Sequence, residues 1–239
     1  MALDLRGCGI GNIVFEAAAH AHNCAVRGIP AAIVHDDPTE LGILDLTRFD
    51  VTSDASRADP TLNPMYCCLR AFFSPEVRES MRSVVRPRDV PIDMTGVEAG
   101  FCFRISNPAL DGDAEFMSDA AIDRMIAEMK KYSRVFACSN SEELLRRVVA
   151  SHPNVATLGS DDFSARNADD HALQWHALAA CPLVYHGIRG RAGGTTSTFA
   201  PAAAAYGQHR RLLGPIIPVG IDNAGELYAG PLGSNRYGW

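Results

Sequence analysis

The chain has 239 residues, of which 47% are hydrophobic, so it is long enough to bury a sizeable core in one or two globular lobes. Its formal net charge of -6 argues against a protein that works mainly by covering nucleic acid or an anionic membrane surface. No stretch approaches the ~20 apolar residues of a membrane span, and no basic segment precedes an apolar core at the N-terminus. We expect a cytoplasmic chain without a membrane span or a nucleic-acid partner.

The cysteines are odd in number and lack the paired C-x-x-C spacing of a zinc site. Most of them lie inside apolar runs, which is typical of buried, reduced thiols. Neither the histidines nor the paired aspartates have the spacing of a metal site, so we expect no metal. The cysteine positions are 8, 24, 67, 68, 102, 138 and 181.

The N-terminal segment predicts a strand, a tight turn and a helix. A short apolar start is followed by alternating glycines and then by an alanine-rich run that predicts a helix over residues 12–27. Gly28 suits the C′ position that ends this helix, and residues 31–35 predict the next strand. Residues 36–65 are polar and irregular and allow no clear prediction.

A second helix is predicted from Pro75 to about Val85. Ser74 suits the N-cap of this helix. Pro75 suits its first turn, because the N–H that proline lacks would have no partner within the helix there. The proline-rich run at 86–91 cannot continue the helix and predicts a linker. We therefore expect an N-terminal αβ lobe over residues 1–90 and a C-terminal Rossmann-like lobe over residues 91–239.

The second lobe alternates short apolar runs with amphipathic ones. On the helix that begins at Ser141, we expect Leu144, Leu145, Val148 and Val149 to face inward. Alternating strands and helices predict an α/β fold with parallel sheets, and the linker predicts two Rossmann-like lobes with a cleft between them. Ligands bind such sheets at the carboxyl ends of the strands. Strands are predicted at 100–105, 135–138, 155–158, 183–186 and 216–219, and helices from Ser118, from Ser141, and over 168–180 and 197–206.

The glycine-rich turn before the first helix is one candidate anion site. Its spacing is G-x-G-x-G, whereas the dinucleotide fingerprint is G-x-G-x-x-G, so the match is weak. An acidic residue, Asp36 or Asp37, does follow the second strand, as that fingerprint requires. The alternative is that the glycines only permit a tight turn and close helix packing.

Arg104 is the second candidate. It emerges at the end of a predicted buried strand, where a guanidinium is costly unless it meets an anion. Its planar fork matches the geometry of phosphate oxygens. A salt bridge to Asp111 or Asp113 is the alternative.

The segment 187–199, directly before a predicted helix, is the third candidate. It combines glycines, two arginines and a run of four hydroxyl-bearing residues. Glycines let the backbone approach a ligand, hydroxyls and free N–H groups donate to it, and the helix dipole favours negative charge. A residue that only caps the helix would explain one of these hydroxyls, so we expect phosphate binding here.

In chain order, these motifs resemble those of the GDP-fucose-dependent fucosyltransferases, which have the two-lobed GT-B fold. Gly9-Ile10-Gly11-Asn12 is similar to their glycine–asparagine turn, and Phe101-Cys102-Phe103-Arg104 to their His-x-Arg strand. Residues 135–140 resemble their strand ending in Ser/Thr-Asp-Asp, and residues 196–199 their Ser-x-Phe helix start. The resemblance covers most of residues 6–207.

The resemblance implies inverting, metal-independent transfer of a fucose-like sugar from a nucleotide diphosphate sugar, GDP-linked, to a glycan or glycoprotein acceptor, with no cofactor. The first lobe would lie on the acceptor side and the second would bind the donor. Arg104 would neutralise the charge on the leaving diphosphate, and Asp113, chosen from the loop acids Asp111, Asp113 and Glu115, would be the general base. The donor-binding residues would be Gly9, Gly11, Asn12, Asn140, Gly194, Thr196, Ser197 and Thr198.

The sequence departs from the family's pattern at Cys102, Ile105 and Asn107, which replace its histidine, second arginine and aspartate. Ser139 or Asn140 stands at its base-recognising carboxylate, and an asparagine offers one carbonyl oxygen where a carboxylate accepts two N–H donors. Two other functions stay open. One is an NAD(P)-dependent oxidoreductase that uses the glycine turn, and the other is a non-catalytic module that binds a sugar nucleotide or glycan.

Overall fold

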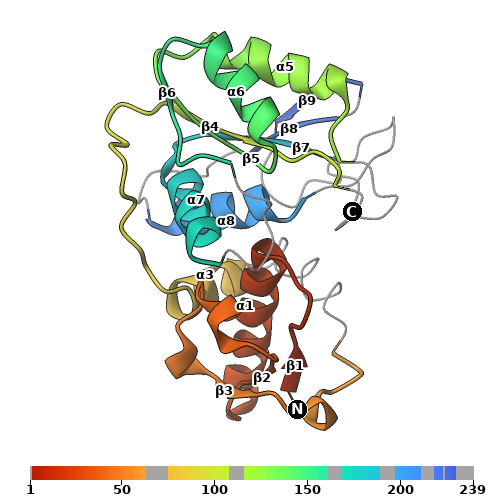
Figure 1. Cartoon of the computed structure of the whole chain (residues 1–239). Helices are drawn as coiled ribbons and strands as arrows, with labels where there is room; N and C mark the ends of the chain where they lie inside the picture. The colour runs from red at the N-terminus through yellow and green to blue at the C-terminus, as the bar shows by residue number, and fades with distance from the viewer. Residues whose placement is uncertain are drawn as a thin grey trace. The chain divides into compact units, whose positions relative to one another are not determined.

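The computed structural model describes residues 2–62, 75–107, 116–160, 168–188, 197–210, 218–222 and 224–229. The chain divides into unit 1, formed by Met1–Arg88 with Phe163–Ala172, and unit 2, formed by Asp89–Asp162 with Leu173–Trp239. Each unit has its own parallel sheet (Figure 1). The predicted α/β fold class, with two units built on parallel sheets, is confirmed.

The sheet of unit 1 has the order β1-β2-β3, with β1 (Ala2–Asp4), β2 (Ala32–Val34) and β3 (Asp50–Thr52) all parallel. The first two strands lie where they are predicted, whereas β3 lies in the polar stretch that allowed no prediction. The strands pair in register, so Asp4, Val34 and Thr52 end at the same edge of the sheet. Side chains that follow these ends therefore converge.

Two helices, α1 (Ile10–Arg27) and α3 (Pro75–Val84), pack against each other in unit 1. The end of α1 is as predicted, because Gly28 adopts the left-handed conformation with φ of 65° and its N–H donates to the Ala25 carbonyl. Arg88 joins the two stretches of chain that form this unit: Nη1 lies 2.7 Å from Asp169 Oδ1, and Nη2 donates to the Gly42 carbonyl at 3.0 Å.

Short 3-10 helices follow β2 and β3, and an aspartate caps each of them. Asp37 Oδ1 accepts hydrogen bonds from both the N–H and the hydroxyl of Thr39, ahead of η1 (Pro38–Leu41). The same arrangement recurs at η2 (Leu46–Arg48) and η3 (Ala55–Arg57). These bonds, chiefly that from the hydroxyl, hold the pKa of the capping carboxyls below the usual range.

Within the described residues, the sheet of unit 2 has six strands in the order β6-β5-β4-β7-β8-β9. All pair in parallel except β9, which is antiparallel to β8 and is not predicted from sequence. The chain runs from β4 outward through β5 and β6, and then returns to the other side of β4 with β7 and β8. The order therefore reverses between β4 and β7, where sheets of this kind bind ligands. The strands are β4 (Ala99–Phe103), β5 (Val135–Ser139), β6 (Val155–Ala156), β7 (Val184–Gly187), β8 (Pro218–Ile221) and β9 (Leu227–Ala229).

Helices cover both faces of this sheet: α5 (Asp119–Met129) and α6 (Glu142–Ser151) one, α7 (Ala168–Ala180) and α8 (Phe199–Arg210) the other (Figure 1). The predicted helix starts at Ser118 and Ser141 are confirmed, and both residues are N-caps, because their hydroxyls accept from the N–H three residues on. The inward prediction for Val149 is wrong, since its relative exposure is 41%. It lies at the edge of the stripe that buries Leu144, Leu145 and Val148, near the helix end.

Gly100 of β4 lies against the end of α7 and against Cys181, the residue after it. A Cβ at this position would lie 2.7 Å from Leu178 Cδ1 and 2.8 Å from Cys181 Sγ. We expect Gly100→Ala to lower the free energy of unfolding by about 1–3 kcal/mol through overpacking. Urea unfolding monitored by circular dichroism measures this. In a Leu178→Ala background the cost should shrink, because the methyl then enters the vacated space; strictly additive effects would contradict the contact.

Asp93 ties the segment before β4 to Arg134. Arg134 donates to Asp93 Oδ2 at 3.1 Å and to the Asp93 carbonyl at 2.8 Å, and the Thr95 N–H donates to Asp93 Oδ1 at 2.9 Å. The Thr95 N–H foremost, with the Arg134 guanidinium, lowers the pKa of Asp93 to about 2.

Because this pKa lies below that of an unfolded-chain aspartate, about 3.9, the carboxylate stabilises the native state above about pH 4 and stops doing so as the pH falls toward about 2. We expect Asp93→Asn to lower the free energy of unfolding near neutral pH. The difference from the native protein should vanish toward pH 2 in urea titrations across this range. A difference that stays constant with pH would rule out the contribution of the charge.

Candidate functional site

Arg104 follows β4 at the carboxyl edge of the unit 2 sheet, beside the reversal of strand order. Its Nη1 donates to the Ile105 carbonyl at 3.0 Å. Its Cζ lies 4.6 Å from the centroid of the Phe116 ring, within the range of a cation–π contact. The Phe116 N–H in turn donates to Ser106 Oγ at 3.0 Å. The guanidinium is therefore held at the sheet edge where a ligand is expected.

Asn140 follows β5, the strand next to β4. Its Oδ1 accepts from the Ile105 N–H at 2.9 Å, and its Nδ2 donates to the Ile105 carbonyl at 2.9 Å. The structure thus brings Arg104 and Asn140 together through Ile105. The Asn140 amide is engaged with this peptide, and its predicted contact with the donor stays a prediction.

The start of α8 carries the hydroxyls that the sequence singles out. Ser197 Oγ accepts from the Phe199 N–H at 3.4 Å, and the Thr198 carbonyl accepts from the Ala202 N–H at 3.0 Å. This helix follows β7, and β7 pairs directly with β4, so the topology assigns the tip of α8 and Arg104 to neighbouring strands. The other predicted residues of this edge lie outside the described residues: Gly194, Thr196, Asp111, Asp113 and Glu115.

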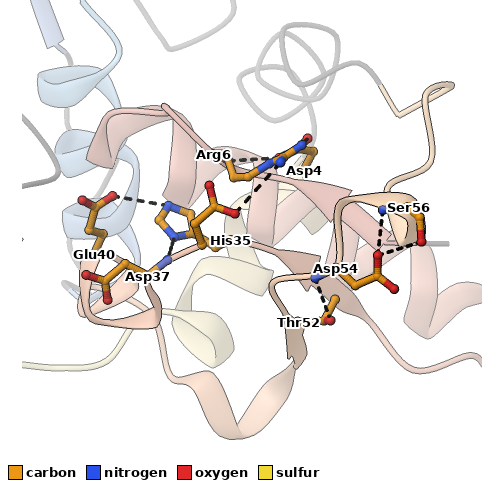
Figure 2. Close-up of polar contacts among 9 residues, drawn as sticks. Asp4, Arg6, His35, Asp37, Glu40, Thr52, Asp54 and Ser56 are labelled. Carbon is orange, nitrogen blue, oxygen red and sulfur yellow. Dashed lines mark hydrogen bonds and ion pairs between the residues drawn. The ribbon is translucent and has the colours of Figure 1, made fainter.

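A second polar cluster lies at the carboxyl edge of the unit 1 sheet (Figure 2). Arg6 Nη2 lies 2.6 Å from Asp4 Oδ2, and Arg6 Nη1 lies 4.0 Å from Asp36 Oδ1. The hydrogen bond from Arg6 is the main reason that the pKa of Asp4 is lowered. Asp4 therefore already neutralises the charge of the Arg6 guanidinium.

His35, on the same edge, was not singled out from sequence. Its ring is buried, and Nδ1 accepts from the Asp37 N–H at 3.2 Å. The ring proton of the neutral form therefore belongs on Nε2, which lies 3.6 Å from Glu40 Oε2 (Figure 2). Its only sequence signal is its place directly after a strand. The histidine fixes the loop after β2 and has no nitrogen left for general-base chemistry in this geometry.

The glycine turn leads into α1. Gly7 has φ of 71°, a conformation that favours glycine, and Gly9 is the N-cap without a side-chain cap bond. Gly11 and Asn12 lie in the first turn of the helix. A Cβ on Gly9 would meet no atom within 4 Å, so close packing does not explain this glycine. Burial raises the pKa of the neighbouring Cys8 to about 12, so its sulfur is a thiol and not a nucleophilic thiolate.

The charged groups of the two edges are held differently. At the unit 1 edge the carboxylates of Asp4 and Asp36 lie beside Arg6, and that of Glu40 lies beside His35. At the unit 2 edge the Arg104 guanidinium donates to the Ile105 carbonyl and stacks on the Phe116 ring.

In the described part of the chain, no three histidine, cysteine or acidic side chains gather closely enough to hold a metal ion. No helix among the same residues has the length and apolar character to cross a bilayer. The described cysteines are all free thiols.

No family model matches the chain, and no curated protein sequence matches it. Solved structures do match its fold. The crystal structure of NodZ α-1,6-fucosyltransferase co-crystallised with GDP has a TM-score of 0.59 at 16% identity, over 96% of this chain and 97% of that chain. A crystal structure of fucosyltransferase NodZ from Bradyrhizobium has a TM-score of 0.58 at 15% identity, over 96% of this chain and 98% of that one. The predicted likeness to a fucosyltransferase of the GT-B type is confirmed at the level of fold.

Proposed function

We propose that this chain is a glycosyltransferase that moves a sugar from a nucleoside diphosphate sugar to a hydroxyl-rich acceptor. The observation that carries the proposal is Arg104, fixed by Ile105 and Phe116 at the strand-order reversal of a Rossmann-like sheet. The GDP bound by a solved structure of the same fold supports a GDP-linked, fucose-like donor.

The donor-side chemistry is electrostatic. As the bond between the anomeric carbon and the β-phosphate oxygen breaks, negative charge builds up on the leaving diphosphate. Arg104 donates to those oxygens, and the first N–H groups and hydroxyls of α8, at Ser197 and Thr198, share the charge. A fixed guanidinium performs this task without a metal ion, so the proposed transfer is metal-independent.

The acceptor is proposed to bind unit 1, whose carboxylates at the sheet edge can accept hydrogen bonds from sugar hydroxyls. The acceptor oxygen attacks the anomeric carbon on the side opposite the leaving diphosphate, which inverts that centre. Its proton passes to a carboxylate base, for which Asp113 remains our choice. The products are the new glycoside and the free nucleoside diphosphate.

The two competing functions make different demands. A nicotinamide enzyme would bind its dinucleotide at the glycine turn of unit 1, with Asp36 or Asp37 on a ribose hydroxyl, and would leave Arg104 without a role. A non-catalytic module would bind the same donor but release no nucleoside diphosphate.

Replacing Arg104 tests the proposed site. We expect Arg104→Ala to lower kcat by about 10²–10³-fold, the loss typical of a group that stabilises transition-state charge. Arg104→Lys should retain part of the activity, because the charge stays but the fork is lost. Arg146→Ala, which removes an exposed arginine of α6, is the matched control and should transfer normally. Turnover of Arg104→Ala close to that of the native protein would refute the assignment.

A thermal-shift panel of GDP, UDP, GDP-fucose and NAD tests the ligand class. A ligand that binds only the native state at a hundredfold excess over its Kd stabilises it by about 2.7 kcal/mol, which raises Tm by several degrees. We expect GDP and GDP-fucose to raise Tm and NAD to leave it unchanged. A shift with NAD alone would favour the oxidoreductase. A shift with GDP-fucose but no release of GDP with any acceptor would favour the binding module.

A further inference from the structure

We propose that Asn140 is a positioning residue that aims the Arg104 guanidinium at the donor diphosphate. The inference rests on the proposed function, because that function gives Arg104 its task. It assigns Asn140 a contact with the protein backbone in place of the donor contact predicted from sequence.

The pairing of β4 with β5 ends just before Asn140. The last register pair is Phe103 with Ser139, and beyond it the two chains diverge into their loops. The Asn140 side chain adds two more bonds across this gap, to the N–H and the carbonyl of Ile105, each at 2.9 Å. An amide side chain has one acceptor and one donor group, so it can pair with a peptide as a neighbouring strand does. It thus holds the backbone directly after Arg104 in place.

The Ile105 carbonyl transmits this restraint to the guanidinium. The same oxygen accepts from Asn140 Nδ2 at 2.9 Å and from Arg104 Nη1 at 3.0 Å. Since Asn140 holds the carbonyl and the carbonyl accepts from Nη1, the asparagine contributes to the direction of the guanidinium. The Phe116 ring, 4.6 Å from Cζ, limits movement on its own side. A misplacement of about 1 Å at a reacting group can cost about 10²-fold in rate.

The two hydrogen bonds to Ile105 require an asparagine at position 140 and not an ionised aspartate. An ionised aspartate would accept from the Ile105 N–H but would set its second oxygen against the Ile105 carbonyl. A protonated aspartate would restore both bonds, because its O–H can donate to that carbonyl. The activity of Asn140→Asp should therefore depend on the protonation of the aspartate. A general loss of stability would not produce this dependence.

Kinetics provide the first arm of the test. We expect Asn140→Ala to lower kcat by about 10–100-fold with a smaller rise in the donor KM, because the mis-aimed guanidinium loses contacts made in the transition state. In the Arg104→Ala background, Asn140→Ala should cost little more, since both act through one group. Asn154→Ala, which removes an exposed amide before β6, is the control and should be unaffected. Fully additive losses would overturn the proposal.

The pH profile of Asn140→Asp provides the second arm and serves if the alanine variant does not fold. We expect the ratio of its kcat to that of the native protein to rise as the pH falls through the pKa of the introduced carboxyl. The Ile105 carbonyl raises that pKa, whereas the Ile105 N–H and the Arg104 guanidinium lower it, so the ratio is followed down to the lowest pH at which the protein stays folded. A ratio that does not change with pH would overturn the proposal.

The third arm needs no ligand and separates the proposal from the proposed function. NMR of the Arg104 Nε–H, assigned by its loss in Arg104→Lys, reports the order of the guanidinium in the free protein. It should be ordered in the native protein and in Asn154→Ala, and mobile in Asn140→Ala. An equally ordered signal in Asn140→Ala overturns the positioning role even if the transferase is active. If the native protein neither binds GDP-fucose nor releases GDP, the proposed function fails instead.

Discussion

The site of unit 2 depends on the central place of β4, paired in parallel with β5 on one side and with β7 on the other. Every residue of β4 is buried, so Arg104, directly after it, is the first side chain that can carry charge to the sheet edge. Gly100 permits the close approach of α7 that buries this strand. The packing that buries β4 therefore also sets the position of the Arg104 guanidinium.

The two units use their charged side chains differently. The loops of unit 1 use their aspartates to cap 3-10 helices and to neutralise Arg6. The loop after β4 in unit 2 holds a guanidinium stacked on an aromatic ring. In the proposed transfer, that guanidinium would serve the donor diphosphate, and the carboxylates of unit 1 would accept hydrogen bonds from acceptor hydroxyls.

Local signals explain which elements were predictable. Ser118, Ser141 and Gly28 act on residues within a few positions of themselves, and each ends or begins its helix as predicted. The strand β3 is as short as β1 and β2, but its residues are exposed or half-exposed, so no apolar run marks it, whereas those of β2 are all buried. Pairing with β2 defines β3, and pairing with β8 defines β9. The role of Asn140 could not be predicted for the same reason, because its partner Ile105 lies 35 residues away and uses only backbone atoms.

The residues beside Arg104 on the sheet explain why its direction matters. In the resembled family a histidine occupies the position of Cys102, which here is a buried thiol in register with His186 of β7. Burial lowers the pKa of His186 to about 4, so its ring is neutral at physiological pH. In the proposed transfer, neither of these two side chains would bring a positive charge to the leaving diphosphate. The guanidinium of Arg104 would bring one, and its effect varies steeply with distance and geometry.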